Sequence, residues 1–192
     1  MWIDFKKTKR AKVPLYDNEL SKATYKLKQN STYQYSIWIE KDRDIGFAKR
    51  YLRRHHYEVL YVYPEEMARS SDYRTTFFKS HKKPKGGYYR CIYCHKKLKG
   101  KIEIDHIYPV HKAKTKEGQF FLKLLGIKSV NDPKNLAASC HRCNRAKSSK
   151  TGLWLIRALL GSHEWYWVSL RIIEVALLIG SGIIIAYGLG YL

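Results

Sequence analysis

The sequence predicts an α+β fold in three parts: a small N-terminal α/β unit in residues 1–85, a module in 86–152 and a helical tail in 153–192. Three observations support this prediction. Alternating and amphipathic segments occupy the first part, two pairs of cysteines enclose most of the second, and the third ends in a long uncharged run. A chain of 192 residues has room for one ordinary domain or two small ones.

The first part contains the signals of strands and helices in alternation. In residues 32–40 the residues Tyr33, Tyr35, Ile37 and Ile39 occur at every second position and so share one face of an extended chain. Residues 57–63 are rich in Tyr and Val. Both segments therefore predict strands. Apolar residues recur every three or four positions over 42–56, which predicts a helix. Residues 17–29 fit a short helix with a thin apolar stripe. We therefore expect a small α/β unit here.

The formal net charge of the chain is +21, and it is unevenly distributed. Two arginines balance two glutamates in residues 153–192, so the whole excess lies before the tail. Basic excess on this scale indicates a polyanionic partner, either nucleic acid or anionic lipid. The helix expected over 42–56 can present Arg50, Arg53 and Arg54 to phosphates, although a solvated basic face explains them equally well.

The four cysteines form two C-x-x-C pairs, Cys91 with Cys94 and Cys140 with Cys143. The N-terminal sequence MWIDFKKTKRAKV has no apolar signal core, so we expect a reducing, cytosolic compartment. There, paired C-x-x-C motifs predict a metal site rather than disulfides. Four thiolates complete a tetrahedral zinc ion and leave no open position, so the predicted zinc is structural.

Polar residues of the types that serve in acid–base catalysis and metal binding lie between and beside these cysteines. Residues 101–111 predict a strand with Asp105 and His106 at its end. Asn135 precedes the second cysteine pair, and Asn144 and Lys147 lie one helical turn apart just after it.

These residues together resemble the HNH endonuclease superfamily in its four-cysteine zinc form. The resemblance covers residues 91–147 and rests on the ordered motifs C-I-Y-C, I-D-H-I-Y-P and N-L-A-A-S-C-H-R-C-N-R-A-K. It implies a ββα-metal fold, a hairpin followed by a helix, that holds a divalent cation. The sequence departs from the family at HKAKTKEGQ, where a glycine-rich turn is often found.

The resemblance also implies a role for each matching residue. His106 is the expected general base and Asp105 a ligand of a catalytic Mg²⁺ or Mn²⁺ ion. Asn144 stands where the family has its last histidine, so the chain is an H-N-N variant with an amide oxygen as the second ligand. Asn135 is expected to hold the hairpin and to orient His106 through its backbone carbonyl. The remaining expectation is that the scissile phosphate is held by Lys147 or Arg145.

The implied reaction is phosphodiester hydrolysis of DNA, most simply double-stranded DNA. The same residue types also occur without a catalytic role, since an asparagine can cap a helix or sit in a turn, and a histidine can be an ordinary partly buried residue. A non-catalytic zinc module that binds nucleic acid at the membrane is therefore kept as an alternative.

The tail predicts a transmembrane helix over about 168–192. At 1.5 Å per residue this stretch is roughly 37 Å long, enough to cross a hydrocarbon core of about 30 Å. The segment WYW at 165–167 is typical of the headgroup region, and Ser162 is expected to cap the helix. The small residues Gly182, Ala186 and Gly190 share one face and would permit homo-oligomer contacts.

The basic excess before the span predicts, by the positive-inside rule, a tail-anchored protein of the cytoplasmic membrane with its nuclease module in the cytoplasm. A nuclease at this place would meet incoming phage or plasmid DNA. The remaining alternative is a soluble homing- or restriction-type nuclease whose tail packs into a partner.

Overall fold

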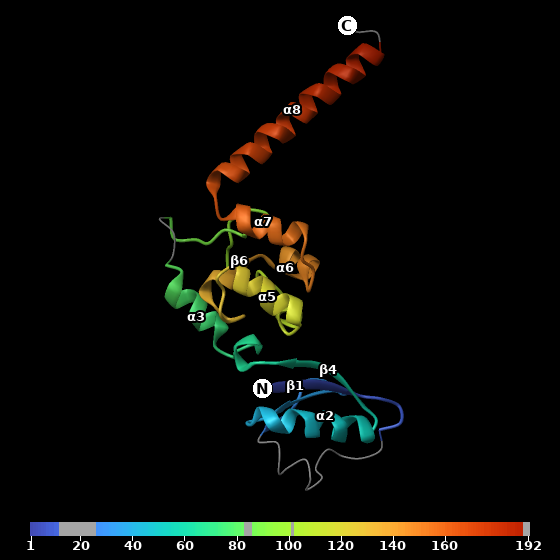
Figure 1. The fold of residues 1–192 in the computed structure, drawn as a ribbon. Helices are drawn as coiled ribbons and strands as arrows, with labels where there is room; N and C mark the ends of the chain where they lie inside the picture. Colours follow the sequence, from blue (N-terminus) through green and yellow to red (C-terminus); the bar gives the residue numbers. More distant parts are fainter. Residues whose placement is uncertain (12–25, 83–85, 101, 190–192) are drawn as a thin grey trace. The chain divides into compact units, whose positions relative to one another are not determined.

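The structure is a computed structural model that describes residues 1–11, 26–82, 86–100 and 102–189. Figure 1 shows the fold and labels several of its helices and strands. The chain forms two compact units, one of residues 1–80 with 108–136 and one of 81–107 with 137–192. The mixed α+β content agrees with the predicted fold class. The sequence placed residues 108–136 in the cysteine module, whereas here they pack with the N-terminal part.

The first unit is built on an antiparallel sheet in the order β2-β3-β1-β4. Its strands are β1 (Trp2–Lys7), β2 (Lys26–Gln29), β3 (Gln34–Trp38) and β4 (Tyr57–Tyr63). The strands predicted at 32–40 and 57–63 are confirmed. The helix predicted over 17–29 is wrong at its end, because residues 26–29 pair with β3 as an edge strand. The remainder of that prediction, up to residue 25, falls outside the described residues.

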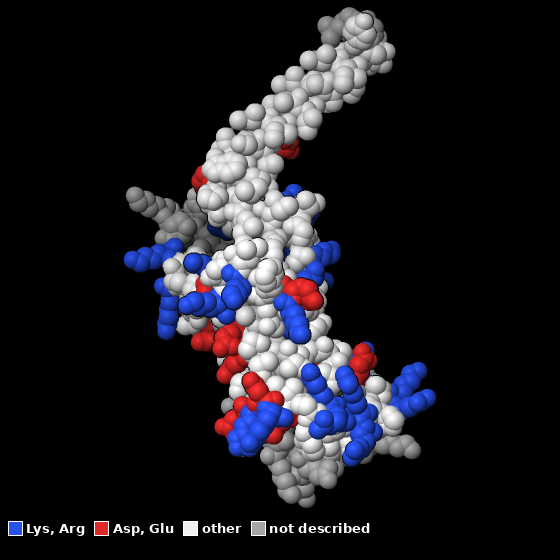
Figure 2. All heavy atoms as spheres, in the orientation of Figure 1, with Lys and Arg blue, Asp and Glu red and all other residues white. Residues whose placement is uncertain are grey.

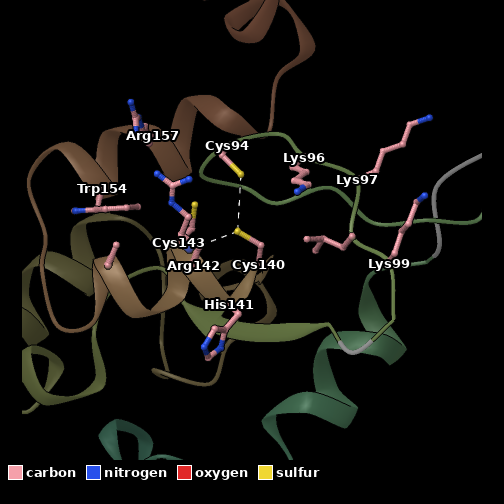
Figure 3. A pocket seen from close by; sticks show the side chains of 12 residues that line it. Cys94, Lys96, Lys97, Lys99, Cys140, His141, Arg142, Cys143, Trp154 and Arg157 are labelled. Atoms are coloured by element: carbon pink, nitrogen blue, oxygen red, sulfur yellow. Dashed lines mark hydrogen bonds between the residues drawn. The ribbon is translucent and has the colours of Figure 1, made fainter.

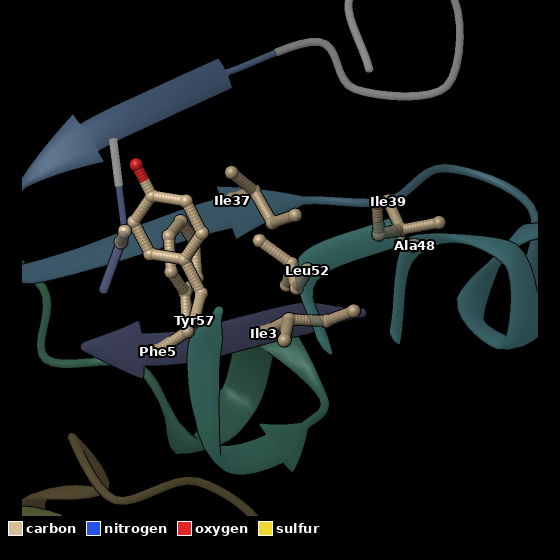
Figure 4. Packing of buried hydrophobic residues seen from close by; sticks show 8 residues of the cluster. Ile3, Phe5, Ile37, Ile39, Ala48, Leu52 and Tyr57 are labelled. Carbon is tan, nitrogen blue, oxygen red and sulfur yellow. The ribbon is translucent and has the colours of Figure 1, made fainter. Parts of the chain in front are cut away.

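The helix predicted over 42–56 is confirmed as a short 3-10 turn, η1 (Asp42–Asp44), followed by α2 (Ile45–Arg54). The apolar side of α2 packs on the sheet, as Figure 4 shows. Ile3, Ile37 and Leu52 are fully buried in this contact. Burying each such side chain contributes about 1.5–3 kcal/mol, so the contact between α2 and the sheet stabilises the first unit.

Asp4 lies between two core residues of β1 and therefore points to the opposite face of the sheet. Its Oδ1 accepts hydrogen bonds from Ser36 Oγ at 2.6 Å and from Tyr63 OH at 2.7 Å. Its Oδ2 lies 2.5 Å from Lys114 Nζ. Burial, and then the charge of Asp4, raise the pKa of the Tyr63 phenol, which keeps that hydroxyl a donor. This buried network joins residues 108–136 to the sheet.

Short helices complete the first unit: η2 (Glu65–Met67), α3 (Tyr73–Ser80), α4 (Val110–Ala113), α5 (Lys116–Leu124) and η3 (Pro133–Asn135). The Val130 N–H donates to the Glu66 carbonyl at 2.9 Å, which fastens the end of this segment to η2. A side chain at Gly118 would come within 1.9 Å of the Lys112 carbonyl oxygen. A glycine is thus needed at position 118, where α4 and α5 approach closely.

The second unit contains a two-stranded sheet of β5 (Glu103–His106) and β6 (Leu136–Ser139). It continues with α6 (His141–Lys147), α7 (Leu153–Gly161) and α8 (Glu164–Gly188). The strand predicted to end in Asp105 and His106 is confirmed as β5. A loop that carries the first cysteine pair is closed by a bridge between Arg90 and Lys97.

The last helix, α8, is long and apolar enough to cross a membrane, and none of its apolar window is buried in the structure. It begins at Glu164, earlier than the predicted start at 168, and so includes the WYW segment. The predicted cap at Ser162 is wrong, since its hydroxyl donates to the Leu159 carbonyl and His163 occupies the cap position. The predicted row of small residues reaches Gly190, which lies outside the described residues.

Candidate metal centre and the adjoining strand

The four cysteines of the second unit come together as predicted. Their Sγ atoms all lie within 4.8 Å of one another, and those of Cys94 and Cys140 are 3.9 Å apart (Figure 3). Four sulfurs at such separations match the donor set and size of a tetrahedral zinc-thiolate site. The residues therefore fit a structural zinc ion.

Local backbone geometry places both cysteine pairs. In the first pair, the Cys91 N–H donates to the Lys96 carbonyl and the His95 N–H donates to the Cys91 carbonyl, with His95 at a φ of 59°. In the second pair, Cys140 is the N-cap of α6, and the Cys143 N–H lies 3.4 Å from its sulfur. A tight loop thus presents one pair of sulfurs, and a helix N-terminus presents the other.

Cys91 is fully buried, and it packs with Tyr93 and Ala158 in a small apolar cluster. Burial raises the pKa of the Cys91 thiol to about 11. A buried thiolate is costly without a cation, so a metal ion bound here would favour the ionised form of this cluster.

Beside the cysteines, the face of β5 that carries Asp105 is joined to α6 by a buried ion pair. Lys147 Nζ lies 2.9 Å from Asp105 Oδ2, and Tyr93 OH donates to the same oxygen at 2.7 Å. Burial, followed by the charge of Asp105, raises the pKa of the Tyr93 phenol, so its hydroxyl stays protonated. Asp105 is thereby held in one position.

Lys147 was expected to hold a phosphate, but the structure places it inside the unit. Its side chain is only 1% exposed, and besides Asp105 it donates to the His106 carbonyl at 2.8 Å. It therefore fixes both residues at the end of β5. Arg145, the other predicted phosphate ligand of this module, is exposed on α6.

Replacing Lys147 with methionine is expected to lower the free energy of unfolding by about 3–5 kcal/mol, because it leaves the Asp105 carboxylate buried without its cation. Urea unfolding followed by circular dichroism measures this. Lys150→Met, at an exposed position just beyond α6, should change stability by no more than about 0.5 kcal/mol. Equal losses of unfolding free energy in the two variants would show that the ion pair between Lys147 and Asp105 does not stabilise the protein.

Glu103 is a site residue that the sequence interpretation missed. Its Oε2 accepts from Asn144 Nδ2 at 2.7 Å, and its Oε1 lies 2.7 Å from His141 Nδ1. The signal was present, because Glu103 stands two residues before Asp105 and so shares its face of the strand. The hydrogen bond from Asn144 Nδ2 to Glu103 orients the Asn144 amide, and the amide oxygen is then the atom suited to a cation.

His106 and Asn135 are placed differently from one another. His106 follows the alternation of β5 onto the same face as Ile104, and its side chain is 5% exposed. Asn135 is fully buried in the first unit, where its amide bonds to the backbone of Tyr108 and Val130. Lys147 donates to the His106 carbonyl, and the expectation that Asn135 orients His106 stays a prediction.

The remaining predicted contacts to nucleic acid, Arg50, Arg53 and Arg54, are exposed on α2 in the first unit. The structure shows a second basic surface that the sequence interpretation did not single out. It surrounds a cavity of about 1140 Å³ beside the cysteines (Figure 3), whose basic lining residues are Lys96, Lys97, Lys99, Arg142 and Arg157.

Comparison of the chain with protein-family models, with curated proteins and with solved structures gives no match. The structure itself defines a class: an α+β protein with a four-cysteine cluster suited to a metal ion and one helix long and apolar enough to cross a membrane.

Proposed function

We propose that this protein is a membrane-anchored, metal-dependent DNA endonuclease of the HNH type. The observation that carries the proposal is the arrangement around β5 and α6. A strand ends in Asp105 and His106, and a helix that begins at the cysteine cluster brings Asn144 and Lys147 to that strand. This arrangement supports the sequence resemblance to the family.

The residues beside β5 fit a hard divalent cation by their chemistry. Asp105 and Glu103 offer carboxylate oxygens and Asn144 offers an amide oxygen, which are the ligand types of Mg²⁺ and Mn²⁺. When bound there, such an ion supplies Lewis-acid stabilisation of charge on the phosphate and on the leaving oxygen. Glu103 and Lys147 hold Asn144 and Asp105 in place for this task.

In the proposed reaction an imidazole nitrogen of His106 accepts a proton from a water molecule. The water oxygen bonds to phosphorus, the bond from phosphorus to the 3′ oxygen breaks, and solvent protonates the released oxygen. Arg145 contacts the phosphate from the exposed side of α6. The products carry a 5′ phosphate and a 3′ hydroxyl group.

Binding to DNA would use exposed basic side chains outside this site. Figure 2 shows Lys and Arg side chains in separate groups over the surface. In the first unit, α2 exposes Arg50, Arg53 and Arg54 on the side opposite its apolar face. These cations suit phosphate contacts that are independent of base sequence.

The anchor in this proposal is α8, with the basic units on the cytoplasmic side. An enzyme at this place would act on incoming phage or plasmid DNA. Specific observations also favour the non-catalytic alternative, a zinc module that binds nucleic acid. His106 is 5% exposed and lies on the face of β5 opposite to Asp105, and Asp105 is paired with Lys147. The two functions differ in a single measurable property, hydrolysis.

The test is a cleavage assay of the purified full-length protein on plasmid, linear and single-stranded DNA. We expect Mg²⁺ or Mn²⁺ to support cleavage of double-stranded DNA and EDTA to abolish it, with 5′ phosphates at the ends. Binding of the same DNA without any cleavage in either metal would instead establish the non-catalytic module.

A further inference from the structure

The loop that follows Cys94 packs against the first turns of α8. The His95 ring stacks on Trp167 with ring centroids 5.0 Å apart and planes 7° from parallel. His95 Nε2 also lies 3.4 Å from Glu164 Oε1. Trp167 Nε1 in turn donates to the Gly161 carbonyl at 2.9 Å. These contacts connect the cysteine loop to the start of the apolar helix.

The end of α7, just before α8, lies in close backbone contact with this loop. A side chain at Gly161 would come within 2.3 Å of the Ile92 carbonyl oxygen. The close backbone approach explains why a glycine ends α7, and it holds residues on the loop at the level of the first turns of α8. The loop is therefore held at a fixed position along the axis of α8, which sets its depth if α8 crosses a membrane.

A cavity of about 370 Å³ lies at this junction, between the loop and α8. Its charged lining is mostly basic. Arg90, Lys96 and Lys97 come from the loop and its flanks, and Arg171 comes from α8, against one carboxylate, Glu174. Lys96 and Lys97 are exposed, and Arg90 donates to the His95 carbonyl at 3.1 Å. The cavity thus offers excess positive charge in a space that accommodates a phosphate group.

We propose that this cavity binds the headgroup phosphate of an anionic lipid. The proposal rests on α8 being the membrane anchor. The consecutive aromatic residues Trp165, Tyr166 and Trp167 suit the headgroup region of a bilayer, and Arg171 follows one turn later. The cations of the loop are held at that same depth by the contact between His95 and Trp167. Lipid phosphates lie at this depth, and each nearby Lys or Arg strengthens binding to an anionic membrane surface.

Nucleic acid is the other polyanion that such cations attract, but the position of the cavity favours lipid. Leu170 and Trp167 form part of the wall, so an occupant meets apolar side chains of the helix as well as charge. A lipid presents a phosphate above acyl chains, which matches this order of basic and apolar groups. Lys96 and Lys97 also line the larger basic cavity beside the cysteines, but that cavity has no contribution from α8 among its lining residues.

The experiment uses the full chain, extracted in detergent and mixed with equimolar phosphatidylglycerol and phosphatidylcholine. Native mass spectrometry measures which lipid stays bound. We expect a preference for phosphatidylglycerol in the unmodified protein, and a decrease of that preference by about five- to twentyfold in Lys96→Gln/Lys97→Gln. Lys123→Gln/Lys128→Gln removes the same charge from exposed positions of the first unit and should keep the preference.

Equal retention of both lipids by the unmodified protein, or an unchanged preference in Lys96→Gln/Lys97→Gln, would overturn the lipid site. Loss of binding to a fluorescent DNA duplex in this variant, with the lipid preference intact, would assign Lys96 and Lys97 to nucleic acid and overturn the lipid site. Zinc content and circular dichroism confirm that each variant is folded. Carbonate extraction of membranes tests the anchor separately: release of the full chain would refute the proposed membrane anchor, whereas retention with equal lipid binding would refute only the headgroup site.

Discussion

Cys91→Ser is expected to remove bound zinc from the protein and to abolish cooperative unfolding of the second unit. Serine is a poor ligand for zinc, and the buried position of Cys91 leaves no space for another ligand to replace the lost thiolate. Structural zinc contributes about 10–16 kcal/mol of apparent binding energy in small zinc-dependent folds, so a loss of several kcal/mol is expected here. Zinc analysis of the purified protein and thermal unfolding with and without a chelator measure both effects.

The matched control for this prediction is His141→Ala. His141 stands between Cys140 and Cys143 in the sequence, and its side chain contacts Glu103 instead of completing the cysteine cluster. This variant should keep about one zinc ion per chain. Retention of zinc and normal unfolding in Cys91→Ser would show that the cluster is not a zinc site.

His106→Ala is expected to reduce DNA cleavage by about 10²–10⁴-fold, the range that a general base contributes. The water would then lack the imidazole that accepts its proton, while DNA binding through the exposed arginines should stay within about twofold. Rates of plasmid cleavage under single-turnover conditions, together with a binding assay, separate these two effects. Because His106 is buried, His106→Asn serves as a second variant of more conservative size.

His111→Ala is the control, because this histidine is exposed on α4 in the first unit and has no role in the proposed reaction. Its cleavage rate should equal that of the unmodified protein. Zinc content and unfolding midpoint are measured for every variant, so that loss of structure is recognised as such. Full cleavage by folded His106→Ala would exclude this residue as the base.

The local elements were predictable because their causes are local. The Tyr- and Val-rich run over 57–63 predicts β4 with the observed bounds, and the spacing of apolar residues over 42–56 predicts the helix that covers the sheet. The order of motifs likewise placed Asp105 and His106 at the end of a strand and Asn144 on a helix. Each of these depends on the composition and periodicity of a short segment, which the sequence displays directly.

The partners of the site residues were not predictable in the same way. Periodicity indicates which face of a strand a residue occupies, but not what packs against that face. Glu103 was overlooked although it shares a face with Asp105, and the contact with Asn144 exists only because α6 packs there. Residues 108–136 belong to the first unit for a similar reason, because Asp4 and Lys114 meet only after folding.

By itself, the sequence determined the paired cysteines, the uncharged run that becomes α8, and the excess of positive charge before it. These are properties of composition and spacing. The tertiary structure alone decided that Lys147 is a buried cation holding Asp105 and His106, and that the cysteine loop lies against Trp167 at the start of α8. Both arise from burial and close approach between segments distant in the chain, and no local pattern encodes those contacts.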